Sequence, residues 1–107
     1  MEAYFDNSAT TKVSEAVKDI VVKVMVEDYG NPSSMHMVGV NAEKYLKTAQ
    51  ENIAKILKVD PKEIYFTSGG SEADNQAIVS AATFGAKKGK KHIISTKIEH
   101  HAVLHTL

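Results

Sequence analysis

The sequence predicts an α/β fold in which N-terminal helices precede one βαβ unit of a mostly parallel sheet. Apolar residues recur at helical spacing in three stretches. Two short stretches rich in β-branched and aromatic residues, 64–67 and 92–96, lie on either side of the third helical stretch. A strand, a helix and a strand in this order predict two parallel strands joined by a crossover. Because two short strands make no stable sheet alone, we expect the chain to be part of a larger domain.

The first predicted helix begins after Ser14, which is a favoured N-cap residue. It ends before residues 30–34, GNPSS, because proline disfavours helix in the residue before it and glycine suits a C-terminal cap. A second helix is predicted over residues 41–58, where one face is apolar and the opposite face carries lysines and acids. The apolar residues of the first helix are Val17, Ile20, Val21 and Val24.

A third helix is predicted over residues 71–86, directly after a glycine-rich turn. Ser71 followed by Asp74 resembles a capping box. A lysine-rich turn, residues 87–91, leads to the second predicted strand, and another helix starts near the end of the sequence. One face of the third helix is made of small residues suited to packing on a sheet: Ala73, Ala77, Ala81 and Ala82.

The composition argues against several classes of function. The net charge is zero and no apolar run approaches the roughly 20 residues that span a bilayer, so we expect neither a nucleic-acid binder nor a membrane protein. The first residues do not form a secretory signal, and no cysteine is available for disulfides or thiolate metal sites, so a cytoplasmic location is expected. All 13 basic residues are lysines, so the guanidinium group that usually binds a substrate carboxylate is missing.

The glycine-rich turn within residues 66–75, FTSGGSEADN, is the sharpest local feature. Its two glycines permit a tight turn and the close approach of a ligand. The first N–H groups of the following helix have no acceptor inside the helix, and the helix dipole adds partial positive charge there. Ser68 and Ser71 add hydroxyl donors, so the turn suits a phosphate group. A tight turn with a capped helix and no ligand is the alternative, because the glycine spacing matches no nucleotide-binding motif.

Three other features have simpler interpretations. His101 and His105 would share a helix face and could hold zinc, but no third ligand lies at a useful spacing, so we predict no metal site. The lysine run over residues 87–91 lacks interleaved aromatic residues and is predicted to be a solvated loop. The methionines are predicted to pack in a core or an interface: Met25, Met35 and Met37.

Four stretches in this order resemble cysteine desulfurases of the NifS/IscS type: residues 4–11 (YFDNSATT), 30–36 (GNPSSMH), 66–75 and 96–104 (TKIEHHAVL). The resemblance covers essentially the whole chain. It implies the class-V aminotransferase family and the fold-type-I architecture of enzymes that use pyridoxal 5′-phosphate (PLP). Residues 1–39 would be the N-terminal arm, helix and GNPSS loop, and residues 40–107 the start of the PLP-binding large domain. The implied enzyme is a homodimer that converts L-cysteine to L-alanine and passes sulfur as a persulfide to acceptor proteins for iron–sulfur clusters or thiolation.

The resemblance also assigns roles to single residues. Gly70 and Ser71 match positions whose N–H groups, with the Ser71 hydroxyl, hold the PLP phosphate. His100 matches a histidine that stacks on the pyridine ring and is proposed to take part in proton transfer, a role that suits an imidazole. Ala9 and Thr10 resemble a segment that lines the substrate pocket. Residues 31–36 resemble a loop near the active site and the dimer contact.

Other parts of the family's site have no counterpart in the sequence. The Schiff-base lysine, the aspartate that faces the pyridinium nitrogen, the substrate-binding arginine and the persulfide cysteine would all lie beyond this length. None of the 13 lysines has a matching context. We therefore expect this chain alone to be catalytically inert. Two alternatives stay open: a non-catalytic remnant that associates with itself or with a relative, and a selenocysteine lyase or other class-V relative.

Overall fold

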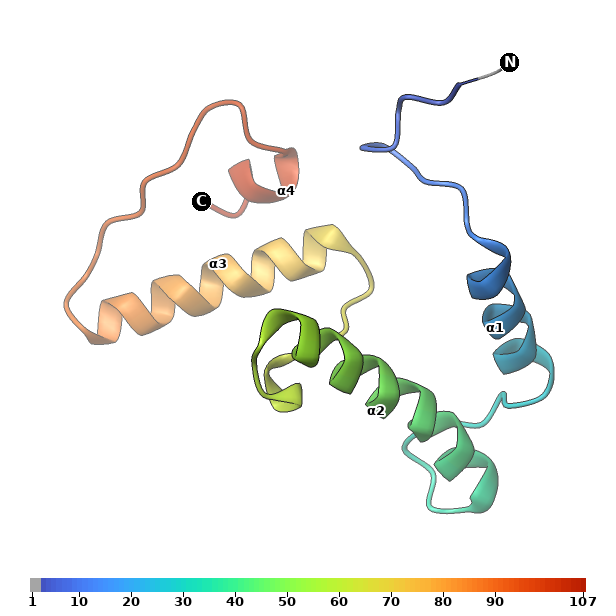
Figure 1. Cartoon of the computed structure of the whole chain (residues 1–107). Helices are drawn as coiled ribbons and strands as arrows, with labels where there is room; N and C mark the ends of the chain where they lie inside the picture. Colours follow the sequence, from blue (N-terminus) through green and yellow to red (C-terminus); the bar gives the residue numbers. More distant parts are fainter. Residues whose placement is uncertain (1–2) are drawn as a thin grey trace. The chain divides into compact units, whose positions relative to one another are not determined.

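The computed structural model describes residues 3–107 and is helical (Figure 1). The chain divides into two compact units, Met1–Ile64 and Tyr65–Leu107. The predicted division after residue 39 rests on the resemblance to longer proteins and stays a prediction. The first unit contains α1 (Glu15–Val26), α2 (Met37–Leu57) and the short 3-10 helix η1 (Pro61–Glu63), and the second contains α3 (Gly70–Lys87) and α4 (His101–Leu104).

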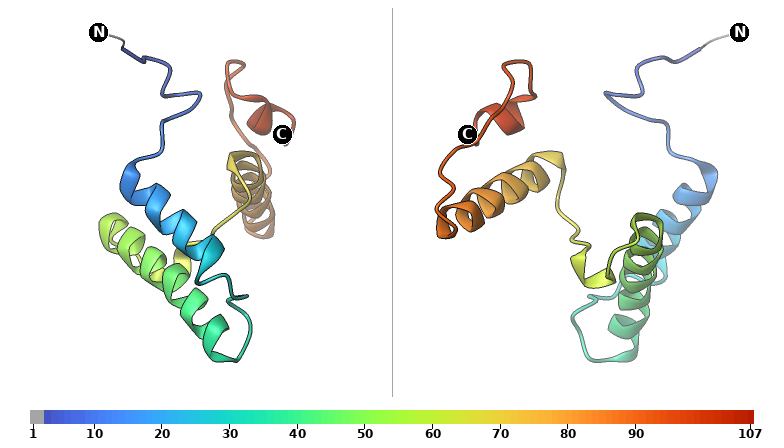
Figure 2. Two further views of the ribbon diagram at one scale, coloured as in Figure 1. Left: turned by 90° about the vertical axis from the view of Figure 1, so that its right-hand side faces the viewer. Right: turned by 60° about the vertical axis from the view of Figure 1, so that its left-hand side comes forward.

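The predicted βαβ unit is wrong for the part of the chain that the structure describes. Residues 64–67 and 92–96 are irregular coil, and neither stretch belongs to a strand within residues 3–107. Residues 91–96 leave the end of α3 as coil, and the chain returns to α4, as both views in Figure 2 show. β-branched residues favour an extended backbone, whereas a strand also requires a neighbour whose N–H and C=O groups pair with its own. The two stretches have the composition of strands but no partner strand within the described residues.

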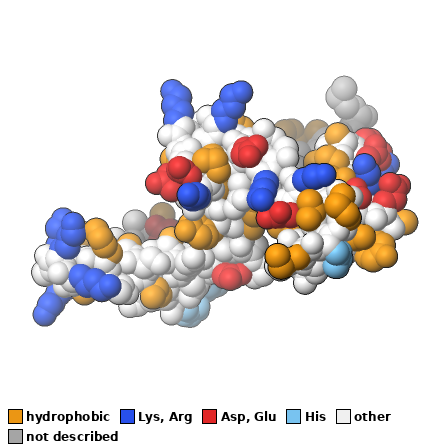
Figure 3. Space-filling model, turned by 90° about the horizontal axis from the view of Figure 1, so that it is seen from below, with side chains coloured by type: hydrophobic (Ala, Val, Ile, Leu, Met, Phe, Trp, Pro, Cys, Tyr) orange, Lys and Arg blue, Asp and Glu red, His pale blue; other side chains and the backbone are white. Residues whose placement is uncertain are grey.

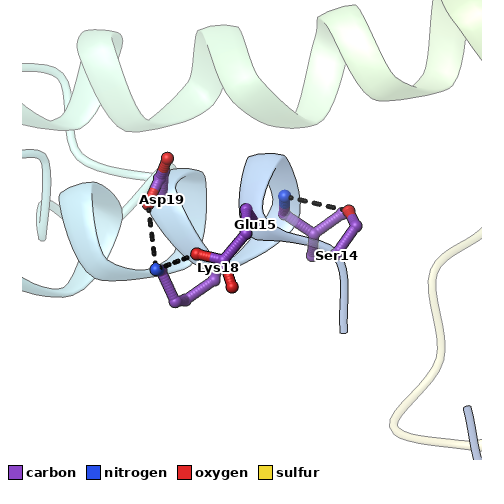
Figure 4. Close-up of polar contacts among 5 residues, drawn as sticks. Ser14, Glu15, Lys18 and Asp19 are labelled. Atoms are coloured by element: carbon purple, nitrogen blue, oxygen red, sulfur yellow. Dashed lines mark hydrogen bonds and ion pairs between the residues drawn. The ribbon is translucent and has the colours of Figure 1, made fainter. Parts of the chain in front are cut away.

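The helix α1 confirms the N-cap predicted at Ser14. The Val17 N–H donates to the Ser14 hydroxyl oxygen at 3.4 Å, and Ser14 itself is extended, with φ −71° and ψ 154°. Figure 4 shows this cap beside the Lys18 ammonium, which pairs with the carboxylates of Glu15 and Asp19. These ion pairs are exposed, so they contribute little stability.

The helix α2 begins before the predicted residue 41, because His36 caps it. The Gly39 N–H donates to His36 Nδ1 at 3.3 Å and satisfies one of the free N–H groups of the first turn. At the other end Lys58 adopts the left-handed conformation, with φ 58° and ψ 44°, which is common just after a helix. The Gln50 side chain then donates to the carbonyl oxygen of Ile64 at 3.0 Å and holds the chain after η1 against α2.

The loop between α1 and α2 packs closely on the start of α2. A Cβ atom on Gly30 would lie 2.3 Å from the carbonyl oxygen of Val38, and one on Gly39 would lie 2.3 Å from that of Ser34. The Tyr45 hydroxyl donates to Asp28 Oδ2 at 2.6 Å, and this hydrogen bond raises the pKa of Tyr45. The first unit is therefore held together where α1 ends and α2 begins.

Few apolar side chains are buried within residues 3–107. Ala42 and Ala54 are the buried hydrophobic residues there, whereas the apolar face of α1 is about half exposed. Met25, Met35 and Met37 are 73%, 100% and 70% exposed, so they pack in no core within the described residues, and their packing in an interface stays a prediction. Figure 3 shows apolar side chains interspersed with charged ones on the face it presents. The helical patterns thus form helices whose apolar faces stay uncovered. No helix among residues 3–107 has the length and apolar character needed to cross a bilayer.

We predict that Gly39→Ala destabilises the first unit, because the new methyl group would overlap the backbone of the preceding loop. Insertion of a methyl group into a filled space costs about 1–3 kcal/mol. Urea unfolding followed by circular dichroism measures this loss. Gly70→Ala is the matched control, since a Cβ atom there meets no atom within 4 Å. Equal stability of the two variants would contradict the prediction.

Candidate functional site

The glycine-rich turn leads into α3 without a side-chain cap. Gly69 is the N-cap residue and is fully extended, with φ 171° and ψ 177°, and no side chain accepts a hydrogen bond from the first turn. The predicted capping box at Ser71 is therefore wrong, since Ser71 already lies inside α3. Within the described residues no acceptor faces the N–H groups of Gly70 and Ser71. These two donors lie at the positive end of the helix dipole.

The space beside the two glycines of the turn is open. A Cβ atom on Gly69 or Gly70 would meet no atom within 4 Å, and neither residue adopts the left-handed region of φ that favours glycine. The fold of residues 3–107 therefore does not itself require glycine at either position. A ligand that must approach the backbone closely would require it. The turn fits a phosphate group, because it combines free donors, a helix N-terminus and room for the anion.

Glu72 satisfies the donors of Ser68. Its Oε2 accepts hydrogen bonds from the Ser68 hydroxyl and from the Ser68 N–H, both at 2.7 Å. The hydroxyl contact, followed by the N–H contact, holds the pKa of the Glu72 carboxyl below its ordinary value. Ser68, which the sequence offered as an anion donor, is therefore engaged within the chain. Sequence reasoning missed this contact of Glu72. The available signal was a serine two residues before the helix together with a glutamate in its first turn.

His100 is the N-cap of α4. Its Nδ1 accepts a hydrogen bond from the Ala102 N–H at 3.1 Å, so the neutral ring carries its proton on Nε2. The residue is exposed, which leaves the ring accessible to a planar ligand. The ring of His101 lies 6.1 Å from that of His100, centroid to centroid, at 60°. The stacking and proton-transfer roles of His100 stay predictions.

The second unit contains all three predicted cofactor residues, Gly70, Ser71 and His100. α4 lies beside the N-terminal part of α3, as Figures 1 and 2 show, and the two helices contact one another. The Asn75 side chain bridges them, since its Nδ2 donates to the carbonyl oxygen of Ser71 at 2.7 Å and to that of Ala102 at 3.3 Å. The structure thus brings the predicted phosphate donors and the histidine into one compact unit.

The remaining predicted residues lie elsewhere. Ala9 and Thr10 belong to the first unit, where both N–H groups donate to the carbonyl oxygen of Asp6, and their predicted role in a substrate pocket stays a prediction. The rings of His101 and His105 stack with centroids 5.3 Å apart. Among residues 3–107 no group of three or more histidine and carboxylate side chains is placed to hold a metal ion.

Comparisons with known proteins match nearly the whole chain. The family model described as aminotransferase class-V matches residues 3–107. A cysteine desulfurase IscS from Clostridium botulinum is 47% identical over 105 residues, which are 98% of this chain and 26% of that protein. A cysteine desulfurase IscS from Methanosarcina thermophila is 48% identical over 103 residues, 96% of this chain and 25% of that protein.

A solved structure titled NifS-like protein has the same fold over almost the entire chain. The two superpose with a TM-score of 0.84 at 42% identity, covering 99% of this chain and 29% of the solved one. The 107 residues therefore correspond to part of a PLP-transferase fold, although the described residues contain no βαβ unit. The chain spans about a quarter of the length of the curated relatives that it matches.

We predict that the Glu72 contact makes the stability of the second unit pH-dependent. A carboxyl whose pKa is lower in the folded state stabilises that state above its unfolded pKa, here near the ordinary value of 4.5. This stabilisation is lost as the pH falls through the lower folded pKa. Thermal melts at a series of pH values should show this loss of stability in the unmodified chain. In Glu72→Gln the part of the pH dependence that comes from this contact should be absent.

The Ser68 amide proton gives a direct check of the same contact. Its NMR signal should move as Glu72 titrates in the unmodified chain and should stay still in Glu72→Gln. Glu51→Gln is the control, because Glu51 is exposed and distant in sequence from the turn. A Ser68 signal that titrates equally in Glu72→Gln would exclude the contact.

Proposed function

The chain belongs to the class-V aminotransferase family, and from this premise we propose that it is part of a PLP-dependent cysteine desulfurase and holds the phosphate of PLP. The observation that carries the proposal is the uncapped start of α3. Within the described residues the N–H groups of Gly70 and Ser71 have no hydrogen-bond acceptor there, in a chain that is similar to cysteine desulfurases along its length. The residues present fit the phosphate end of the cofactor.

The phosphate would be held by backbone donors at a helix end. The N–H groups of Gly70 and Ser71 and the Ser71 hydroxyl would donate to its oxygens, and the helix dipole would favour its negative charge. Hydrogen bonds to a charged acceptor are roughly twice as strong as those between neutral groups. PLP, when bound, supplies an electron sink for carbanion chemistry.

His100 would contact the other end of the cofactor. Its Nδ1 lone pair is engaged by the Ala102 N–H, so the ring is held in one orientation and Nε2–H points away from the helix cap. In our proposal the face of this ring lies on the pyridine ring and the imidazole takes part in proton transfer. Imidazoles in general suit such transfer because they gain and lose a proton near neutral pH. His100 is the residue of this chain to which we assign a catalytic role.

The chemistry of sulfur transfer would need groups from outside these residues. A persulfide forms on a cysteine thiolate, and the chain has no cysteine and no arginine. We therefore propose that the 107 residues bind the cofactor without converting L-cysteine to L-alanine themselves. The homodimer, the sulfur-acceptor proteins, the cytoplasmic location and the choice between cysteine and selenocysteine as substrate stay predictions.

A second role, self-association, has an observation in its favour. Residues 92–96 have the composition of a strand but no partner strand in the described structure, and Ile94 is 92% exposed. Exposed segments of this composition favour pairing with another chain. Light scattering would show a defined oligomer if this role holds, and a monomer would exclude it.

The cofactor proposal is tested with PLP and the purified chain. We expect saturable binding that inorganic phosphate displaces, and no single lysine that borohydride traps in a specific adduct. Specific trapping at one lysine would show that the chain carries its own Schiff-base partner. An absence of phosphate-displaceable binding would refute the phosphate site.

We predict that Gly70→Ala weakens binding of PLP and of inorganic phosphate without loss of stability. The new Cβ would occupy the open space beside Gly70 and hinder the close approach of a phosphate to the backbone, while a helical alanine is as stable as glycine or more so. Loss of one hydrogen bond to a charged group corresponds to about a tenfold weaker affinity or more. NMR titration measures the affinity and a thermal melt measures the stability.

Gly85→Ala is the control for this prediction, because Gly85 lies in the same helix far from the turn. Its affinity for phosphate should match that of the unmodified chain. Unchanged affinity in Gly70→Ala would mean that phosphate does not bind at the turn.

A further inference from the structure

The side chain of Asn75 joins two parts of the second unit that are far apart in sequence. Asn75 and Ala102 are 27 residues apart, yet Nδ2 of Asn75 lies 3.3 Å from the carbonyl oxygen of Ala102. The same nitrogen donates to the carbonyl oxygen of Ser71, one turn earlier in α3, at 2.7 Å. An amide nitrogen has two protons, so it can satisfy both carbonyl oxygens at once.

The hydrogen bonds continue from Ala102 to the imidazole. The carbonyl oxygen of Ala102 accepts from Asn75, and the N–H of Ala102 donates to Nδ1 of His100 at 3.1 Å. A connected path therefore runs from Ser71 through Asn75 and Ala102 to His100. Its two ends are a predicted phosphate donor and the predicted stacking histidine.

α4 depends on contacts of this kind. α4 has four residues, which is about one helical turn. Forming a single turn restricts several backbone dihedral angles and gains very few hydrogen bonds, so such a helix is not stable in isolation. Its contact with α3 therefore decides where α4 and its N-cap lie. The bond from Asn75 to Ser71 is local to one helix, whereas the bond to Ala102 fixes α4 against α3.

We propose that Asn75 is a positioning residue that sets the place of the His100 imidazole relative to the phosphate-binding turn. The inference rests on the proposed function and assigns to the same site a residue that touches neither the phosphate nor the ring. The two donor protons of the amide are essential to this role. A carboxylate of the same shape has only acceptors and would face two carbonyl oxygens.

The test compares Asn75→Asp with Gln76→Glu. Both variants exchange an amide for a carboxylate at adjacent exposed positions of α3, so their net charge and their effect on the helix dipole match. Only the first removes the bridge. The ligand is pyridoxine 5′-phosphate, which has the ring and phosphate of the cofactor but no aldehyde to react with the 13 lysines.

The first measurement needs no ligand. The amides of Leu104 and His105 donate to the carbonyl oxygens of His100 and His101, so their hydrogen exchange reports on α4. Loss of the bridging hydrogen bond should speed their exchange about fivefold in Asn75→Asp, with a change of less than about twofold in Gln76→Glu. Equal rates in the two variants would overturn the inference.

The second measurement follows the ring of His100 by nitrogen NMR. In the unmodified chain its signals should show the proton on Nε2, because Nδ1 accepts from Ala102. Asn75→Asp should raise the share of the other tautomer, and Gln76→Glu should not. Destabilisation of α3 away from this contact would not change the ratio of the two tautomers of His100. A ring protonated on Nδ1 in the unmodified chain would also overturn the inference.

The third measurement separates this inference from the proposed function. Pyridoxine 5′-phosphate should shift the amide signals of Gly70 and Ser71 in all three proteins. It should shift those of α4 in the unmodified chain and in Gln76→Glu, and at least about fivefold less in Asn75→Asp. If Gly70 and Ser71 do not respond in the unmodified chain, the proposed function fails, and the first two measurements still decide the role of Asn75. If α4 responds fully in Asn75→Asp, the inference fails and the proposed function stands.

Discussion

The N–H groups in the first turn of a helix need acceptors that the helix cannot supply, and this constraint organises the described structure. Ser14 caps α1, His36 caps α2, Asp60 caps η1 and His100 caps α4, each by accepting a backbone N–H. α3 is different, because its N-cap is a glycine and no side chain accepts from its first turn. Glu72 reaches back to Ser68 instead, which holds the turn while the donors of the helix end stay free. These N–H groups without acceptors are the physical basis of the proposed phosphate site.

The sequence predicted those features that depend on neighbouring residues. Ser14 and the apolar repeat after it predicted the start of α1. The glycine pair at residues 69–70 predicted the turn that leads into α3. The predictions failed where a second segment decides the outcome. Residues 64–67 and 92–96 have the composition of strands. A strand also needs a partner segment, and the residue pattern within one stretch does not predict that partner.

Caps were the other source of error, because several residues compete for the same N–H groups. The sequence places His36 in a loop, yet its Nδ1 accepts from Gly39 and starts α2 before residue 41. The sequence predicts Ser68 as an anion donor, yet its hydroxyl donates to the carboxylate of Glu72. No local pattern indicates the contact of Asn75 with Ala102, because the two residues are 27 positions apart. Sequence reasoning thus located the turn, while only the structure shows which of its donors are free.

The cap at His100 is compatible with the role proposed for its ring. The Ala102 N–H engages the lone pair of Nδ1, which lies in the plane of the imidazole. A stacked pyridine ring would contact the face of the imidazole, which is perpendicular to that lone pair. The two interactions therefore do not compete. Hydrogen bonds connect His100 through Ala102 and Asn75 to Ser71, so in our proposal the orientation of the imidazole depends on the same helix end that presents Gly70 and Ser71.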